Sequence, residues 1–185
     1  MKNFIVQAVK RIVIGPPLYY AWVSLLLVLI AVGIASYIKQ LEMGLIATGM
    51  TSYVSWGFYL GNFTFLVGVA AAAVLLIIPA YLYDFGPIKD IVIVGEILAI
   101  SALLMCMMFV TADLGRPDRI WHLLPGLGIL NVPSSLLGWD ILVLNGYLFL
   151  NLFIPGYIIY KAYNEKPVNY RLLLPFILLS IPWAV

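Results

Sequence analysis

Residues 91–110 read IVIVGEILAISALLMCMMFV, and Glu96 is the only acidic or basic side chain in this stretch. A helix of about 20 apolar residues is long enough to cross the roughly 30 Å of hydrocarbon in a bilayer. Three further stretches have the same character, at 18–38, 54–83 and 136–160. The sequence therefore predicts an all-α integral membrane protein with four complete transmembrane helices that form a bundle.

The composition excludes several other classes of protein. Of the 185 residues, 64% are hydrophobic and only 10% are charged, whereas a soluble domain carries roughly 25% charged residues. A net charge of +2 is too small to indicate a nucleic-acid partner. The single cysteine, Cys106, and the single histidine, His122, cannot provide a thiolate cage or a pair of axial haem ligands. We therefore expect no haem and no iron–sulfur cluster on this chain.

The last apolar run is shorter than a complete span. It begins at Leu172 and reaches Val185 after about 21 Å of helix, less than the hydrocarbon thickness. We expect it to be the start of a fifth helix, and the chain to be the N-terminal part of a larger protein. The alternative is a half-span that rests on neighbouring helices. The expected organisation is an N-terminal segment at 1–16, the four-helix bundle at 17–161, and a loop with the incomplete helix at 162–185.

The distribution of basic residues predicts the orientation in the membrane. Basic residues accumulate in cytoplasmic loops. With the N-terminus inside, the cytoplasmic segments hold seven of the ten basic residues, namely Lys2, Lys10, Arg11, Lys89, Lys161, Lys166 and Arg171. We therefore expect a multi-pass protein of the cytoplasmic membrane with a cytoplasmic N-terminus, and an outward-facing loop at 111–135. Residues 40–50 are expected to lie along the interface.

Two acidic residues lie within the predicted spans. Glu96 is in the inner half of the third span, and Asp140 is about one turn into the fourth from its outer side. An ionisable group in a span costs several kcal/mol unless it is paired or hydrated, which makes it a functional candidate. Both are candidates for a proton relay. The alternative is a structural hydrogen bond to a neighbouring helix.

The second span opens with the sequence WGFYLGNFTF at 56–65. Small residues recur at Gly57, Gly61, Gly68 and Ala72, which predicts a face on which another helix packs closely. The Asn62 amide lies next to that face and needs a partner there. Tyrosines near the ends of spans, including Tyr81, are expected to be interfacial anchors.

The outer loop holds charges of both signs in the sequence TADLGRPDRIWHLL at 111–124. Asp113 is expected to end the third span, with Gly115 and Pro117 turning the chain. One interpretation is a salt-bridged cap on the helix ends. The other is the polar rim of a pocket open to the outer leaflet, flanked by Asn131 and Trp139.

These motifs resemble the NrfD polysulfide reductase family over roughly residues 40–160. The resemblance rests on DLGRP at 113–117 with Arg119 and WHLL at 121–124, on 56–65, and on the pair Trp139-Asp140. The sequence GFYLGN at 57–62 is most similar to family members of the DsrP and HmcC type. The resemblance implies a haem-free, quinone-interacting subunit of about eight to ten helices. It also implies an extracytoplasmic four-cluster ferredoxin-like iron–sulfur partner, often with a multihaem cytochrome c and other membrane subunits.

The predicted function follows from this resemblance. We expect electron exchange between the menaquinone pool and the iron–sulfur partner, with coupling to proton movement as a further option. The candidates for binding menaquinone are Tyr59, Asn62, Asp113, Arg116 and His122, while Asp140 and Glu96 are the proton-relay candidates. Two alternatives stay open, a transporter or channel bundle and a structural anchor without its own quinone site.

Overall fold

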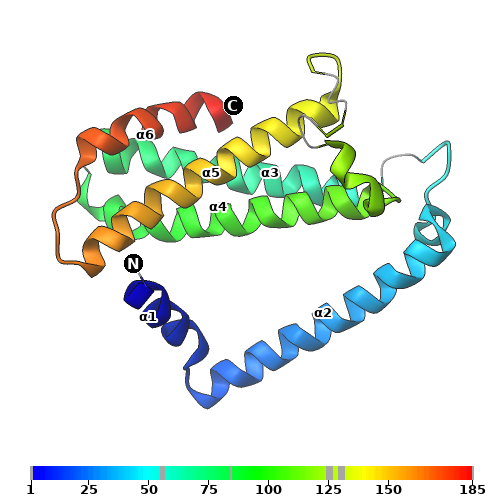
Figure 1. Cartoon of the computed structure of the whole chain (residues 1–185), viewed down its shortest axis with the longest axis horizontal. Helices are drawn as coiled ribbons and strands as arrows, with labels where there is room; N and C mark the ends of the chain where they lie inside the picture. Colours follow the sequence, from blue (N-terminus) through cyan, green and yellow to red (C-terminus); the bar gives the residue numbers. More distant parts are fainter. Residues whose placement is uncertain (1, 55–56, 84, 124–126, 129–131, 185) are drawn as a thin grey trace. The chain divides into compact units, whose positions relative to one another are not determined.

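Four long apolar helices dominate the computed structural model, which describes residues 2–54, 57–83, 85–123, 127–128 and 132–184 (Figure 1). They are α2 (Pro17–Met43), α3 (Phe58–Ile77), α4 (Gly86–Asp113) and α5 (Leu136–Tyr163). Each is long and apolar enough to cross a membrane, α3 together with the turn that continues it. The predicted all-α fold with four spans is confirmed. The fifth apolar run forms α6 (Tyr170–Ala184), a shorter apolar helix, as expected.

The first of two compact units is Met1–Tyr53. It contains α1 (Lys2–Val13), α2 and a short 3-10 helix, η1 (Leu45–Thr48). α2 begins at Pro17, where a missing backbone N–H leaves no helical hydrogen bond unmade. It continues to Met43, past the predicted end at residue 38, and Gly44 then turns the chain with a φ of 79°. Gln40 is the buried side chain of α2. The exposed side chains of 18–38 are largely apolar, as lipid requires, and the exposed charged residues Lys39 and Glu42 lie in the last two turns.

The second unit, Val54–Val185, is a ring of four helices. α3 packs on α4, α4 on α5, α5 on α6, and α6 returns to α3. Because consecutive helices run in opposite directions, the start of α3, the end of α4 and the start of α5 lie at the same end of this ring (Figure 1). We call this the α4–α5 loop end.

The core of this unit consists of two apolar clusters. The first cluster lies nearer the α4–α5 loop end, and the second lies nearer the other end. The buried members of the first are Ala70, Ala73, Ala99, Ala102, Leu103, Cys106, Leu144 and Tyr147. The buried members of the second are Ile77, Ala80, Val92, Ile154, Ile158, Leu173 and Ile177. Alanines on α3 and α4 allow the two backbones to approach closely. The first cluster is tied across the ring by the Tyr147 hydroxyl, which donates to the Ala70 carbonyl at 2.9 Å.

The packing face of α3 differs from the predicted one. Gly61, Gly68 and Ala72 are exposed, and a methyl group at Gly61 or Gly68 would meet no atom within 4 Å. α3 contacts its neighbours instead through Ala70 and Ala73. The spacing of small residues identified a smooth helix face, but not the face that is buried in the described part of the chain.

α3 does not run as a regular helix to its predicted end. It continues as one turn of π-helix, η2 (Ile78–Leu82). Pro79 has no N–H to donate, and wider hydrogen bonds form around it, from Tyr83 N–H to the Ile78 carbonyl at 3.3 Å and from Phe85 N–H to the Pro79 carbonyl at 3.0 Å. A π-turn changes the angular positions of the side chains that follow it, and Tyr81 lies within this turn.

Candidate functional site

The α4–α5 loop end is shaped by two helix termini. α4 ends at Asp113, and Gly115 turns the chain with a φ of 67° into the 3-10 helix η3 (Pro117–Leu123). α5 begins after Ser135, whose hydroxyl oxygen accepts a hydrogen bond from Gly138 N–H at 3.2 Å. The Trp139 indole N–H donates to the Pro133 carbonyl at 3.0 Å. These contacts fix the first turn of α5, and with it the position of Asp140.

A cavity of about 220 Å³ lies between the start of α3, the end of α4 and the start of α5. Its polar side chains are Tyr59, Asp113 and Asp140, and its other lining residues are Leu60, Phe63, Phe109, Val110, Leu114 and Leu137. The Tyr59 ring lies 6.1 Å from that of Phe109, centroid to centroid. Three of the predicted site residues, from three different helices, are therefore brought together in one apolar-walled space. We call it the polar cavity.

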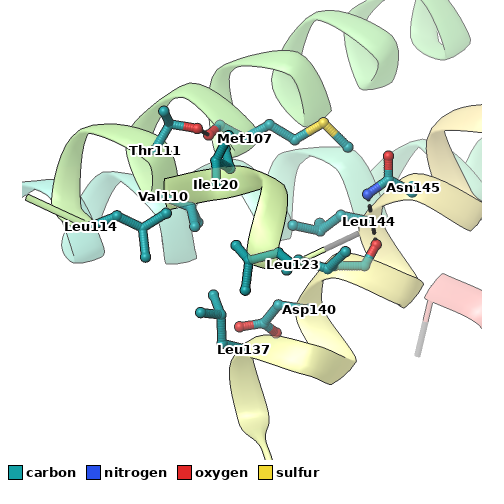
Figure 2. A pocket seen from close by; sticks show the side chains of 11 residues that line it. Met107, Val110, Thr111, Leu114, Ile120, Leu123, Leu137, Asp140, Leu144 and Asn145 are labelled. Atoms are coloured by element: carbon teal, nitrogen blue, oxygen red, sulfur yellow. Dashed lines mark hydrogen bonds between the residues drawn. The ribbon is translucent and has the colours of Figure 1, made fainter. Parts of the chain in front are cut away.

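A second cavity of about 230 Å³ adjoins the first (Figure 2). The two share the lining residues Val110, Leu114, Leu137 and Asp140. η3 contributes Ile120 and Leu123, α4 contributes Met107 and Thr111, and α5 contributes Ile141, Leu144 and Asn145. The Thr111 hydroxyl donates to Met107 and the Asn145 amide to Ile141, each within its own helix. We call this space the apolar cavity, and Asp140 borders both.

The two carboxylates of the polar cavity have no side-chain partner in the part of the chain that the structure describes. Within the described ranges, Asp113 and Asp140 make no hydrogen bond and no ion pair through their side chains. No group of three His, Cys, Asp or Glu side chains able to hold a metal ion occurs among these residues either. A phenol and two carboxyl groups in an apolar space are suited to an organic ligand with polar oxygens.

The remaining predicted binding residues lie outside both cavities. The Asn62 amide donates to the Phe58 carbonyl of its own helix at 2.8 Å. Arg116 is exposed, and its guanidinium is 3.7 Å from the Asp118 carboxylate in the same loop. His122 is exposed, with its ring 3.8 Å from that of Trp121. Three other residues of the motifs, Trp56, Leu124 and Asn131, fall outside the described residues.

Glu96 belongs to a different part of the ring. It is 1% exposed and lies on α4 between Val92 of the second cluster and Ala99 of the first. Neither of its carboxylate oxygens has a hydrogen-bond partner. The hydroxyl of Tyr81, in the π-turn, lies within electrostatic reach of this carboxyl, but the two do not meet the geometry of a hydrogen bond. Glu96 is thus a buried acid without a charged or hydrogen-bonded partner among the described residues.

Two further polar residues lie at the level of Glu96, between the two apolar clusters. Asn151 on α5 is 2% exposed; its amide N–H donates to the Tyr147 carbonyl at 2.9 Å, while its oxygen has no partner. Ser180 on α6 is 1% exposed and donates to the Ile177 carbonyl at 2.8 Å. We call Glu96, Asn151 and Ser180 the polar belt. Asn151 and Ser180 were not predicted from the sequence, although an amide in an apolar run is a visible signal.

The comparisons with known proteins agree with the motifs. The model of the family described as Polysulphide reductase, NrfD, matches residues 46–181. This range includes α3, α4, η3 and α5, and therefore all residues of both cavities and most of α6.

Three curated proteins are similar to the chain. A selenate reductase subunit of Mesobacillus selenatarsenatis is 30% identical over 124 residues, which is 67% of this chain and 28% of that protein. A putative dimethyl sulfoxide reductase membrane subunit of Halobacterium salinarum is 29% identical over 55% of this chain and 23% of its own length. The Hdr-like menaquinol oxidoreductase integral membrane subunit of Archaeoglobus fulgidus is 21% identical over 70% of this chain and 31% of its own length. The matches thus span less than a third of each relative, and no solved structure matches the chain.

Proposed function

We propose, on the premise that this chain belongs to the NrfD polysulphide reductase family, that it binds menaquinone at the α4–α5 loop end as part of a respiratory oxidoreductase complex. The chain is a multi-pass integral membrane protein. The observation that carries the proposal is the polar cavity, where Tyr59, Asp113 and Asp140 converge within apolar walls.

The donor set of the polar cavity fits a quinone headgroup. A headgroup of this kind has two carbonyl oxygens on an apolar ring, so it needs hydrogen-bond donors and apolar walls. The Tyr59 hydroxyl can donate a hydrogen bond, and the carboxyl groups of Asp113 and Asp140, which have no side-chain partner among the described residues, can bind the ligand's oxygens when protonated. The adjoining apolar cavity, with Met107, Leu123 and Leu144, offers an apolar continuation.

Bound menaquinone would supply a two-electron, two-proton couple, and the residues of the cavity handle the protons. Tyr59 orients the ligand by donating a hydrogen bond, and the apolar walls exclude water from the ring. Asp140 borders both cavities, so its carboxyl group holds or releases a proton beside the ligand. Asp113, the last residue of α4, lies where the polar cavity meets the chain's turn and passes protons on to the aqueous side.

Glu96 serves in this proposal as a proton-relay residue reached from the opposite end of the ring. The support is its burial without a partner, since a purely structural acid would be hydrogen-bonded. The hydroxyl of Tyr81, which lies within electrostatic reach of the Glu96 carboxyl group, is the candidate to exchange that proton.

The partner and the orientation complete the proposal. The bias of basic residues supports a cytoplasmic N-terminal segment at 1–16, which directs the α4–α5 loop end outward. An extracytoplasmic four-cluster iron–sulfur subunit, with or without a multihaem cytochrome c, would exchange electrons there. Two relatives are named as subunits of reductases, and one as a menaquinol oxidoreductase subunit. The GFYLGN sequence at 57–62 supports assignment of the chain to the DsrP and HmcC type of family member.

Turnover of menaquinol by the purified complex tests the proposal. Asp140→Asn and Tyr59→Phe remove a proton-accepting and a donating group from the polar cavity, and positioned groups of this kind contribute about 10²–10⁴-fold to rate. The matched control is Asp118→Asn, because Asp118 is exposed and outside both cavities. Loss of turnover in the first two variants with the control unchanged is expected. Full turnover in all three would contradict the proposal, and solute flux in vesicles without a redox partner would favour a transporter.

A further inference from the structure

α1 has one apolar and one polar face. Its sequence is KNFIVQAVKRIV, and at 100° per residue the positions 5, 6, 9, 12 and 13 fall on one side of the helix. These are Ile5, Val6, Val9, Ile12 and Val13, each between 53% and 67% exposed. The other side carries Gln7, Lys10 and Arg11, and α1 contains no acidic residue. The helix therefore presents an apolar stripe, without cover from its own unit, opposite a basic face.

The end of α1 is fixed to the start of the first span. The Tyr19 hydroxyl donates to the Ile12 carbonyl at 2.5 Å, and the Tyr20 hydroxyl donates to the Val13 carbonyl at 3.1 Å. Gly15 N–H in turn donates to the Tyr20 hydroxyl oxygen at 3.4 Å. The two tyrosines thus bind carbonyl groups that the last turn of a helix leaves unpaired.

These tyrosines also define a depth in the membrane. They lie in the first turn of α2, and tyrosines at the end of a span lie at the level of the lipid headgroups. Because their hydroxyl groups bind the last carbonyls of α1, that end of α1 is held at the same level. A helix in this place with an apolar and a basic face meets acyl chains on one side and headgroup phosphates on the other.

We propose that α1 is an interfacial helix that binds anionic phospholipid, with its apolar stripe towards the acyl chains and with Lys10 and Arg11 at the headgroups. Two observations select this occupant over a protein partner: the basic charge without any acid, and the direct continuity with a membrane span through Tyr19 and Tyr20. The proposal is independent of the quinone site, since it requires only that α2 spans the membrane.

Spin-label accessibility in the full-length protein tests this proposal. Labels are placed at Val9→Cys and at Gln7→Cys after Cys106, the single cysteine, is replaced by serine. The protein is reconstituted in phosphatidylcholine vesicles with and without phosphatidylglycerol. With phosphatidylglycerol present, we expect the Val9 label to favour oxygen, which partitions into acyl chains, and the Gln7 label to favour a water-soluble nickel chelate.

Neutralising the basic face tests the role of anionic lipid. Lys10→Gln with Arg11→Gln is expected to weaken the interfacial state about thirtyfold, so that the Val9 label returns to its behaviour in phosphatidylcholine alone. The matched control is Lys166→Gln with Arg171→Gln, two exposed basic residues outside α1, which leaves the labels unchanged. A Val9 label exposed to the nickel chelate would overturn the proposal, as would one that neither reagent reaches, because that result indicates a covering protein.

Discussion

Glu96, the proposed proton-relay residue, is expected to lower the stability of the fold. It is 1% exposed and neither carboxylate oxygen has a partner, so no hydrogen bond among the described residues is lost when it is replaced. A charged side chain at the centre of a spanning helix costs about 2.5–3.5 kcal/mol, and a buried polar group without a partner costs about 1–3 kcal/mol. Replacement by an apolar residue of similar size removes that cost.

Glu96→Met is therefore expected to raise the free energy of unfolding by about 1–3 kcal/mol, and Glu96→Gln to change it little. Both variants are expected to lower proton-coupled turnover by about a hundredfold, the lower end of what a positioned proton-transfer group contributes. For Glu96→Met, stability is thus expected to rise while turnover falls. This combination distinguishes a residue retained for function from one retained for structure, whose replacement lowers stability.

Reversible unfolding in mixed micelles measures the first change, and menaquinol turnover of the reconstituted complex measures the second. Leu103→Ala, in the first apolar cluster, is the control for the unfolding assay and is expected to destabilise by about 2–5 kcal/mol. If Glu96→Met destabilises the protein by more than about 1 kcal/mol, the carboxyl group has a structural partner and the reasoning is refuted.

Three further predictions concern the packing of the ring. Ala73→Leu overfills the buried face of α3 and is expected to destabilise the protein by about 1–3 kcal/mol, whereas Ala72→Leu, on the exposed side, is expected to be neutral. If unfolding assays showed Ala72→Leu to be the more destabilising change, the packing face of α3 would be the one predicted from the glycines. Tyr147→Phe removes the bond to Ala70 and is expected to cost about 0.6 kcal/mol, with the exposed Tyr83→Phe unchanged. Ser135→Ala removes the cap of α5 and is expected to cost about 1 kcal/mol; an unchanged unfolding midpoint would contradict the role of this cap.

The spans were predictable from the sequence because the bilayer requires a fixed length of apolar helix, and four such runs are plain. The place of Asp113 at the end of its span also followed from the sequence, since Gly115 and Pro117 come directly after it. The convergence of Tyr59, Asp113 and Asp140 was also predictable from the four spans, because consecutive helices of alternating direction bring these three helix ends together.

Other features depend on tertiary contacts that a single sequence does not specify. Tyr81 has the position of an interfacial anchor, yet the π-turn at Pro79 places its hydroxyl near Glu96. His122 shares a motif with Asp113, but η3 leaves its ring exposed against Trp121. Ala70 and Gly68 are both small residues, and contacts with α4 and α5 decide which of them is buried.

Photoaffinity labelling of the intact complex with an azido-menaquinone tests the central claim most directly. We predict that the labelled positions, identified by mass spectrometry, fall in the stretches that line the two cavities, 59–63, 107–114, 120–123 and 137–145. We also predict that Asp140→Asn reduces this labelling and that Asp118→Asn does not. Labelling confined to other stretches, or unaffected by both substitutions, would contradict a quinone site at the α4–α5 loop end.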